Sequence, residues 1–93
     1  MARVAEPILV PANEWVDLTG GPVDTVTFQV LSARSGASVL VRGAATKPGT
    51  VVTAGFMYPP GEGVLNEEAA GFGGTTLWGR STLGTAVVIV ATT

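Results

Sequence analysis

The sequence predicts an all-β fold, a small antiparallel β-sandwich or jelly-roll of seven to eight short strands with an extended N-terminal arm. Three observations predict it. Apolar and polar residues alternate with a period of two in short segments, glycine and proline clusters separate these segments, and no helical period extends beyond one turn. At 93 residues the chain is a single domain. We expect the arm to occupy residues 1–13 and the sandwich residues 14–93.

The N-terminal segment favours extended chain. Residues 7–11 read Pro-Ile-Leu-Val-Pro, and prolines suit an arm or an edge strand because they cannot donate to a hydrogen-bond ladder. Residues 13–18 then carry one large aromatic anchor, Trp15. The Thr-Gly-Gly-Pro run at 19–22 predicts a turn.

The next two expected strands cover residues 25–30 and 38–42, where apolar and polar side chains alternate. The turn between them, at residues 33–37, should join them as a hairpin, with Gly36 where a positive φ is needed. The side chains expected in the core are Val26, Phe28, Val30, Val39 and Val41.

The following stretch is less regular. We expect a strand at 50–56, an irregular Pro-Pro-Gly loop at 59–63 and a short strand at 63–66. Residues 67–70 form the one helix-like tetrad, which is too short for more than a turn. Residues 71–74 predict a flexible or tightly turned glycine loop.

The C-terminal part predicts two strands, 75–81 and 85–91, joined by a hairpin loop at 82–84. The last strand is apolar at successive positions, which is typical of a central strand buried on both faces. One face should lie on the core. The other should be covered either by the N-terminal arm or by a neighbouring subunit.

Composition excludes several kinds of chemistry. The chain has no cysteine and no histidine, so thiolate sites, histidine ligands and Ser-His-Asp machinery are absent. The seven acidic residues show neither the paired arrangement of a glycosidase nor the spacing of an EF-hand loop. The glycine loop at 71–74 lacks the lysine of a phosphate-binding loop. We therefore expect no enzymatic activity, no cofactor and no metal.

Nucleic acid and membranes are also unexpected partners. The net charge is −2, and the few basic residues are scattered. The longest apolar run, residues 86–91, is far shorter than the ~20 residues of a membrane-spanning helix. Synthesis in the cytoplasm fits this composition.

The low charge content points to association with other proteins. Charged residues make up 13% of the chain, about half of the ~25% of an average soluble domain. A domain of this size buries only roughly 60–65% of its unfolded surface, so its outside must consist largely of threonine, alanine, glycine and apolar atoms. Aromatic side chains and arginines on such a surface are candidate interface anchors. The candidates are Ile8, Leu9, Val10, Trp15, Arg42, Phe56, Tyr58, Phe72, Trp78 and Arg80.

An alternative use of the aromatic residues is carbohydrate binding. Trp15, Tyr58 and Trp78 could stack on a sugar ring, although a tryptophan in a sandwich is more often a core residue.

Several short motifs together resemble a recurring small structural protein of tailed bacteriophages. They are Trp-Val-Asp-Leu at 15–18, the Val-Thr-Phe-Gln-Val strand at 26–30, the Ser-Gly-Ala-Ser-Val-Leu-Val-Arg segment at 35–42, Pro-Gly-Glu at 60–62, and the segment from Leu77 to Val90. The resemblance covers most of residues 15–91. Its motifs mark strands and turns, so no ligand residue is carried over from it.

The resemblance implies a β-sandwich or jelly-roll module of the virion. Its first implied function is a head decoration or cement protein that stabilises the capsid by burying apolar surface between capsid subunits. The alternative is a tail or head fibre or spike module that binds a host-surface glycan. The implied partners are the major capsid protein and further copies of the chain, with a trimer as the favoured oligomer and the capsid surface as the location.

Overall fold

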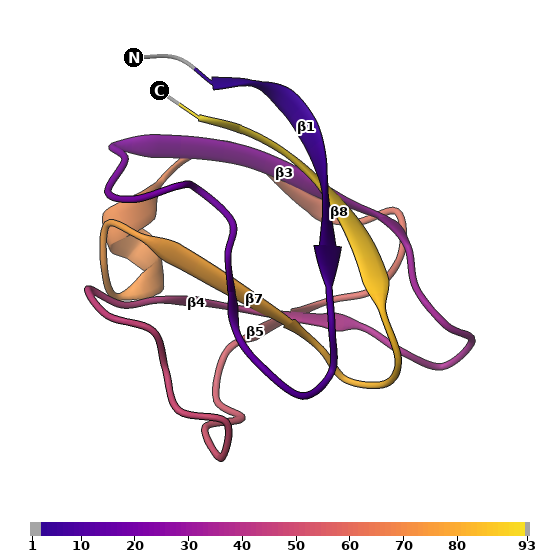
Figure 1. Cartoon of the computed structure of the whole chain (residues 1–93). Helices are drawn as coiled ribbons and strands as arrows, with labels where there is room; N and C mark the ends of the chain where they lie inside the picture. The colour runs from indigo at the N-terminus through magenta and orange to yellow at the C-terminus, as the bar shows by residue number, and fades with distance from the viewer. Residues whose placement is uncertain (1–2, 93) are drawn as a thin grey trace.

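The computed structural model describes residues 3–92 and confirms the small β-sandwich (Figure 1). Eight strands form two four-stranded antiparallel sheets, and the described residues contain no α-helix. One sheet, sheet A, has the order β1-β8-β3-β6, and the other, sheet B, has the order β2-β7-β4-β5. The elements are β1 Arg3–Val10, β2 Val16–Asp17, β3 Thr25–Ser32, β4 Val39–Gly43, β5 Phe56–Tyr58, β6 Gly63–Glu68, the 3₁₀ turn η1 Ala69–Phe72, β7 Leu77–Ser81 and β8 Ala86–Thr92.

The strand order is that of a jelly-roll. The pairs β1·β8, β2·β7, β3·β6 and β4·β5 are nested inside one another, as in a single long hairpin. The additional pairs β8·β3 and β7·β4 close this hairpin into two sheets. Rolling up a long hairpin in this way gives the two-sheet, eight-stranded jelly-roll, and residues 44–55 form the loop at the tip of the hairpin.

The two short hairpins expected from the sequence are wrong. The turn at 33–37 has the expected geometry, with Gly36 at φ 80° and the Ala37 amide donating to the Arg34 carbonyl at 2.8 Å. However, β3 lies in sheet A and β4 in sheet B, so this turn carries the chain between sheets. The loop at 82–84 does the same for β7 and β8. The two strands that flank each turn each bury an apolar face. These faces pack against each other across the core, and the two strands do not pair within one sheet.

The core lies between the sheets and follows the period of two. In β3 and β8 every second side chain is buried, and the expected core residues of β3 and β4 are all at most 2% exposed. Leu77 of β7 and Val10 of β1 complete the same cluster. The core members are Val10, Leu18, Val26, Phe28, Val30, Val39, Val41, Ala69, Leu77, Ala86, Val88 and Val90.

Of the two forms that its prolines suit, an arm or an edge strand, the N-terminal segment takes the edge strand. We expected residues 1–13 to stand outside the domain, yet residues 3–10 form β1 and pair with β8 of the same chain. Residues 1–2 lie outside the described part. The reason is the alternation within this segment, because Ile8 and Val10 face the core opposite Val88 and Ala86. Pro7 lacks an amide hydrogen, which an edge strand tolerates.

The strand expected at 50–56 is also wrong. Only its last residue, Phe56, belongs to a strand, and residues 44–55 form a long loop. The Val52 amide donates to the Gly49 carbonyl at 3.0 Å, which closes a turn inside the expected strand. The β-branched residues here face no neighbouring strand, so their propensity has no ladder to support.

Candidate interaction surfaces

The outer face of sheet A is bare, and the two central strands of the sheet carry no charge. Neither β3 nor β8 contains a charged residue, and the outward positions of β8 are the half-buried Val87, Ile89 and Ala91. Leu9 on β1 and Leu31 on β3 flank β8 on this face and are 67% and 49% exposed. An exposed apolar strand of this kind is more stable against a partner than in water.

The structure shows whether the N-terminal segment covers the outer face of the last strand, β8. The sequence left open whether the N-terminal segment or a neighbour covers the second apolar face of residues 85–91. In the structure β1 lies beside β8 in the same sheet and covers none of its outer face. A shallow apolar groove between β3 and β8, lined by Thr27, Gln29 and Ile89 among others, remains open there.

The outer face of sheet B, in contrast to that of sheet A, is covered by the loop at 44–55. Arg42 of β4 and two side chains of β7, Trp78 and Arg80, project outward from this sheet. All three donate hydrogen bonds to carbonyl groups of the loop. The outward-facing Leu40 is consequently only 8% exposed.

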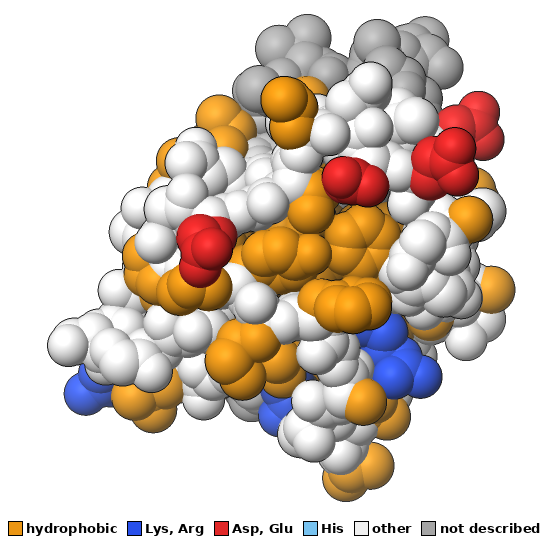
Figure 2. Space-filling model, turned by 180° about the vertical axis from the view of Figure 1, so that it is seen from behind, with side chains coloured by type: hydrophobic (Ala, Val, Ile, Leu, Met, Phe, Trp, Pro, Cys, Tyr) orange, Lys and Arg blue, Asp and Glu red, His pale blue; other side chains and the backbone are white. Residues whose placement is uncertain are grey.

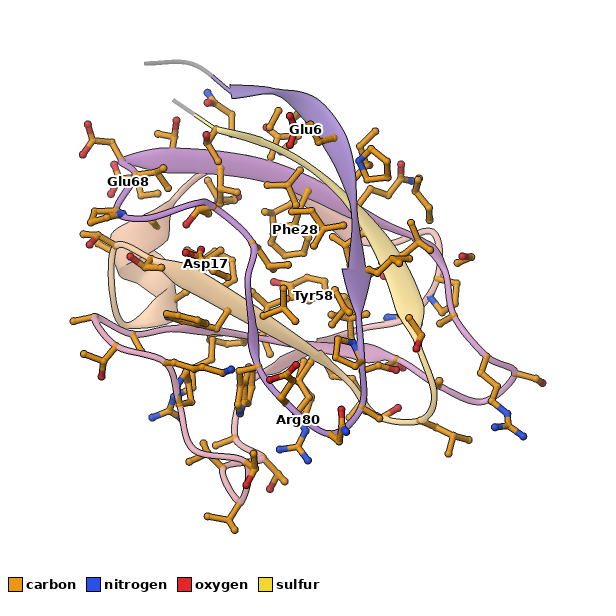
Figure 3. All side chains as sticks on the ribbon, viewed as in Figure 1. Glu6, Asp17, Phe28, Tyr58, Glu68 and Arg80 are labelled. Atoms are coloured by element: carbon orange, nitrogen blue, oxygen red, sulfur yellow. The ribbon has the colours of Figure 1, made fainter. Side chains whose placement is uncertain are left out.

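The contacts that hold this loop are hydrogen bonds from side chains to the backbone. Arg80 Nη1 donates to the carbonyl oxygens of Thr50 and Val52, the latter at 3.1 Å, and its Nε donates to that of Ala12 at 2.8 Å. The buried indole of Trp15 also donates to the Val52 oxygen, at 3.0 Å. Figure 3 shows Arg80 below the sheet, among the loops that it joins.

Two further bonds hold the ends of the loop. Trp78 Nε1 donates to the Ala44 carbonyl at 3.0 Å, and Arg42 Nη1 donates to the Ala54 carbonyl at 3.3 Å. Loop carbonyls that a strand would offer to a neighbouring strand therefore bind side chains of sheet B. These hydrogen bonds tie the loop to the sheet.

These contacts change the interpretation of four candidate interface residues. We expected Trp15, Arg42, Trp78 and Arg80 to reach a partner, but their donors bind this chain's own loop. Trp15 is 1% exposed and cannot be a surface anchor. Of the three aromatic residues that could stack on a sugar ring, Trp15 is therefore excluded by its burial.

The remaining aromatic candidates gather at one edge of the sandwich. Phe56 and Tyr58 of β5 and Phe72 of η1 lie around the core residue Phe28. The rings of Phe28 and Tyr58 meet edge to face at 5.0 Å, and those of Phe56 and Phe72 at 5.6 Å. Figure 3 shows Phe28 and Tyr58 pointing toward each other between the sheets. We call this group the aromatic edge.

The candidates from the N-terminal segment are divided between core and surface. Val10 is fully buried, Ile8 packs partly against the core, and only Leu9 faces solvent. Among the exposed apolar side chains that the sequence reasoning missed are Leu31, Val51 and Leu65. Leu31 ends an alternating strand, so its outward position could have been read from the period. Nothing local marks the other two.

Burial raises the pKa of Tyr58 above its ordinary value of 10.0, and the nearby carboxylate of Glu67 raises it further. Both effects favour the neutral phenol. Tyr58 is the single tyrosine of the chain, so an ultraviolet absorbance titration reports this group alone.

We expect the Tyr58 pKa to lie above 10.0 and to fall partway toward it in Glu67→Gln, because burial is the larger cause. Stability from the neutral phenol is present below pH 10 and is lost as the pH rises through the raised pKa. Glu62→Gln, which removes the same charge from the turn at 59–63, should leave the titration unchanged. An equal shift in both variants would contradict a specific contact with Glu67.

Residues 3–92 contain neither a metal-ligand cluster nor a membrane-spanning helix. No three acidic side chains gather there as a metal site would require. No helix in this range has the length and apolar character needed to cross a membrane. Comparisons with family models, with curated proteins and with solved structures give no significant match to the chain.

Proposed function

We propose that this protein is a structural module of a virion, a decoration or cement protein that binds the major capsid protein through the outer face of sheet A. The observation that carries the proposal is the difference between the two outer faces. Sheet B is covered by the chain's own loop, whereas the face of sheet A is left open over the uncharged strands β3 and β8. A stable solution monomer gains nothing from an exposed face of this kind.

The size of the face fits a contact with one large partner surface. The two longer dimensions of the molecule are 34 and 25 Å, and they limit the area that one face can bury. The area bounded by these two dimensions is close to the ~800 Å² that each partner buries in a standard protein interface. Many copies on a shell would each add such a contact, and their sum would stabilise the shell. Two-sheet jelly-rolls also occur in viral capsid proteins, which is an analogy of fold only.

A sedimentation experiment tests this proposal. Heads from a virus that lacks the gene for this chain are mixed with the purified protein and separated by centrifugation. We expect Leu9→Glu and Leu31→Glu each to weaken binding at least about tenfold, because a carboxylate would be buried without a partner. The control is Leu83→Glu, since Leu83 is 48% exposed in the β7–β8 turn.

Both outcomes are informative. Binding that survives both variants, or wild-type protein that stays in the supernatant, would remove the proposed role of this face. The fibre or spike alternative predicts instead that the purified domain binds glycans on an array. Light scattering of the wild type separately tests the proposed trimer.

A further inference from the structure

The aromatic edge contains a strand that can accept another strand. β5 is the last strand of sheet B, and its Phe56 and Met57 are 55% and 63% exposed. This three-residue strand contains no charged residue and no proline, two of the features that protect a free edge. Its neighbour β6, at the same edge of the sandwich, is protected by Glu67, Glu68 and the irregular Asn66 at φ 52°.

A groove lies beside this strand. It holds about 250 Å³ between β5, β6 and η1. Phe56, Tyr58, Val64 and Phe72 give it an apolar lining, and Glu67 and Glu68 stand at its rim. Figure 2 shows hydrophobic side chains gathered in the middle of one side of the molecule, with acidic side chains above them and basic ones below.

The charges around the groove are arranged asymmetrically. No described lysine or arginine pairs with Glu67 or Glu68, and the ion pair between Lys47 and Glu14 lies elsewhere. Arg42 lies in an adjoining groove that shares Phe56 and Phe72, and it already donates to a loop carbonyl. The Glu67 side of the rings is therefore the one that would attract a cation.

We propose that the aromatic edge binds an extended segment of a partner protein, which adds to β5 as a further strand and places an arginine or lysine over the groove. Side chains alternate along an added strand, so those on the side of Phe56 and Tyr58 point into the groove. A cation there meets aromatic ring faces and the carboxylate of Glu67. This surface is separate from the outer face of sheet A.

A peptide titration followed by NMR tests the proposal on the full chain. The probe is a blocked seven-residue peptide, Thr-Val-Thr-Arg-Thr-Val-Thr, and its comparison peptide carries Glu in place of Arg. We expect the arginine peptide to shift the amide signals of residues 56–58 and to bind at least about tenfold more tightly than the glutamate peptide. An arginine peptide with methylated backbone nitrogens cannot donate hydrogen bonds to the edge strand β5, so it should bind more weakly than the unmethylated peptide.

Matched variants identify the carboxylates. Glu67→Gln with Glu68→Gln should weaken the arginine peptide about tenfold, whereas Glu62→Gln should not. Equal binding of both peptides, shifts confined to other strands, or no binding would overturn the proposal. Shifts at residues 56–58 that grow with protein concentration alone would make a second copy the occupant and would also overturn it. Leu9→Glu and Leu31→Glu should leave peptide binding unchanged, which separates this result from that on the head-binding face.

Discussion

Replacing Phe28 with alanine should lower the free energy of unfolding by about 3–5 kcal/mol. The side chain is 2% exposed within the core cluster, and its ring packs against Tyr58 and Phe72. The rings around it come from β5 and η1, and alanine would leave a cavity that these rigid neighbours cannot fill. Urea unfolding followed by circular dichroism measures the loss. It is large relative to the roughly 5–14 kcal/mol expected for a domain of this length.

The comparison variants separate burial from the loss of an aromatic ring. Phe28→Leu keeps most of the volume and should cost less than about 1.5 kcal/mol. Phe56→Ala removes a ring of the same edge that is 55% exposed, so its effect should also be much smaller. Similar losses for Phe28→Ala and Phe56→Ala would contradict the closely packed position of Phe28 in the core.

Trp15→Ala should cost a similar amount, about 3–5 kcal/mol, and should also loosen the loop at 44–55. The indole is 1% exposed outside the main core cluster, and its N–H donates to the Val52 carbonyl. Its loss removes both the packing under the loop and one of the hydrogen bonds that hold it. Urea unfolding gives the stability, and hydrogen exchange of the Val52 amide, which donates to Gly49, reports the loop.

Trp15→Phe distinguishes the two contributions. It keeps an aromatic ring but loses the hydrogen bond, which is worth about 1 kcal/mol. We expect faster exchange at Val52 in both variants and a large loss of stability only in Trp15→Ala. Unchanged exchange in Trp15→Ala would contradict the role of this side chain in holding the loop.

The sequence predicts the features that depend on the alternation of apolar and polar side chains over a few residues. The strand at 25–30, the paired valines of β4 and the apolar final strand all follow from alternation, because the side chains of a strand face opposite sides in turn. The turn at 19–22 is confirmed too, since the Asp17 carboxylate accepts hydrogen bonds from the Thr19 and Gly20 amides. These features are decided within a few residues.

What the sequence does not predict depends on distant contacts. The turn at 33–37 looks the same whether it joins neighbouring strands or crosses between sheets, and only the partners of β3 and β4 decide. The loop at 44–55 has strand-forming residues, yet Trp15 and Arg80 bind its carbonyls from 28 to 37 positions away. Because these contacts join residues far apart in the sequence, the sequence does not show that Trp15 and Arg80 bind within the chain.

The N-terminal segment shows how such a contact changes an experiment. Deleting residues 1–12 would test an arm if it stood free of the domain. Because β1 pairs with β8, the deletion would instead remove an edge strand together with the buried Val10. Single exposed substitutions, such as Leu9→Glu, are the cleaner probe of binding.

The most direct test of the proposed role is a cryo-EM reconstruction of the virus heads carrying the wild-type protein. We predict density for this fold on the outside of the shell, with β8 and β3 against the capsid subunits and the loop at 44–55 directed away from them. Density with the outer face of sheet A toward solvent, or heads without this protein, would contradict the proposed role.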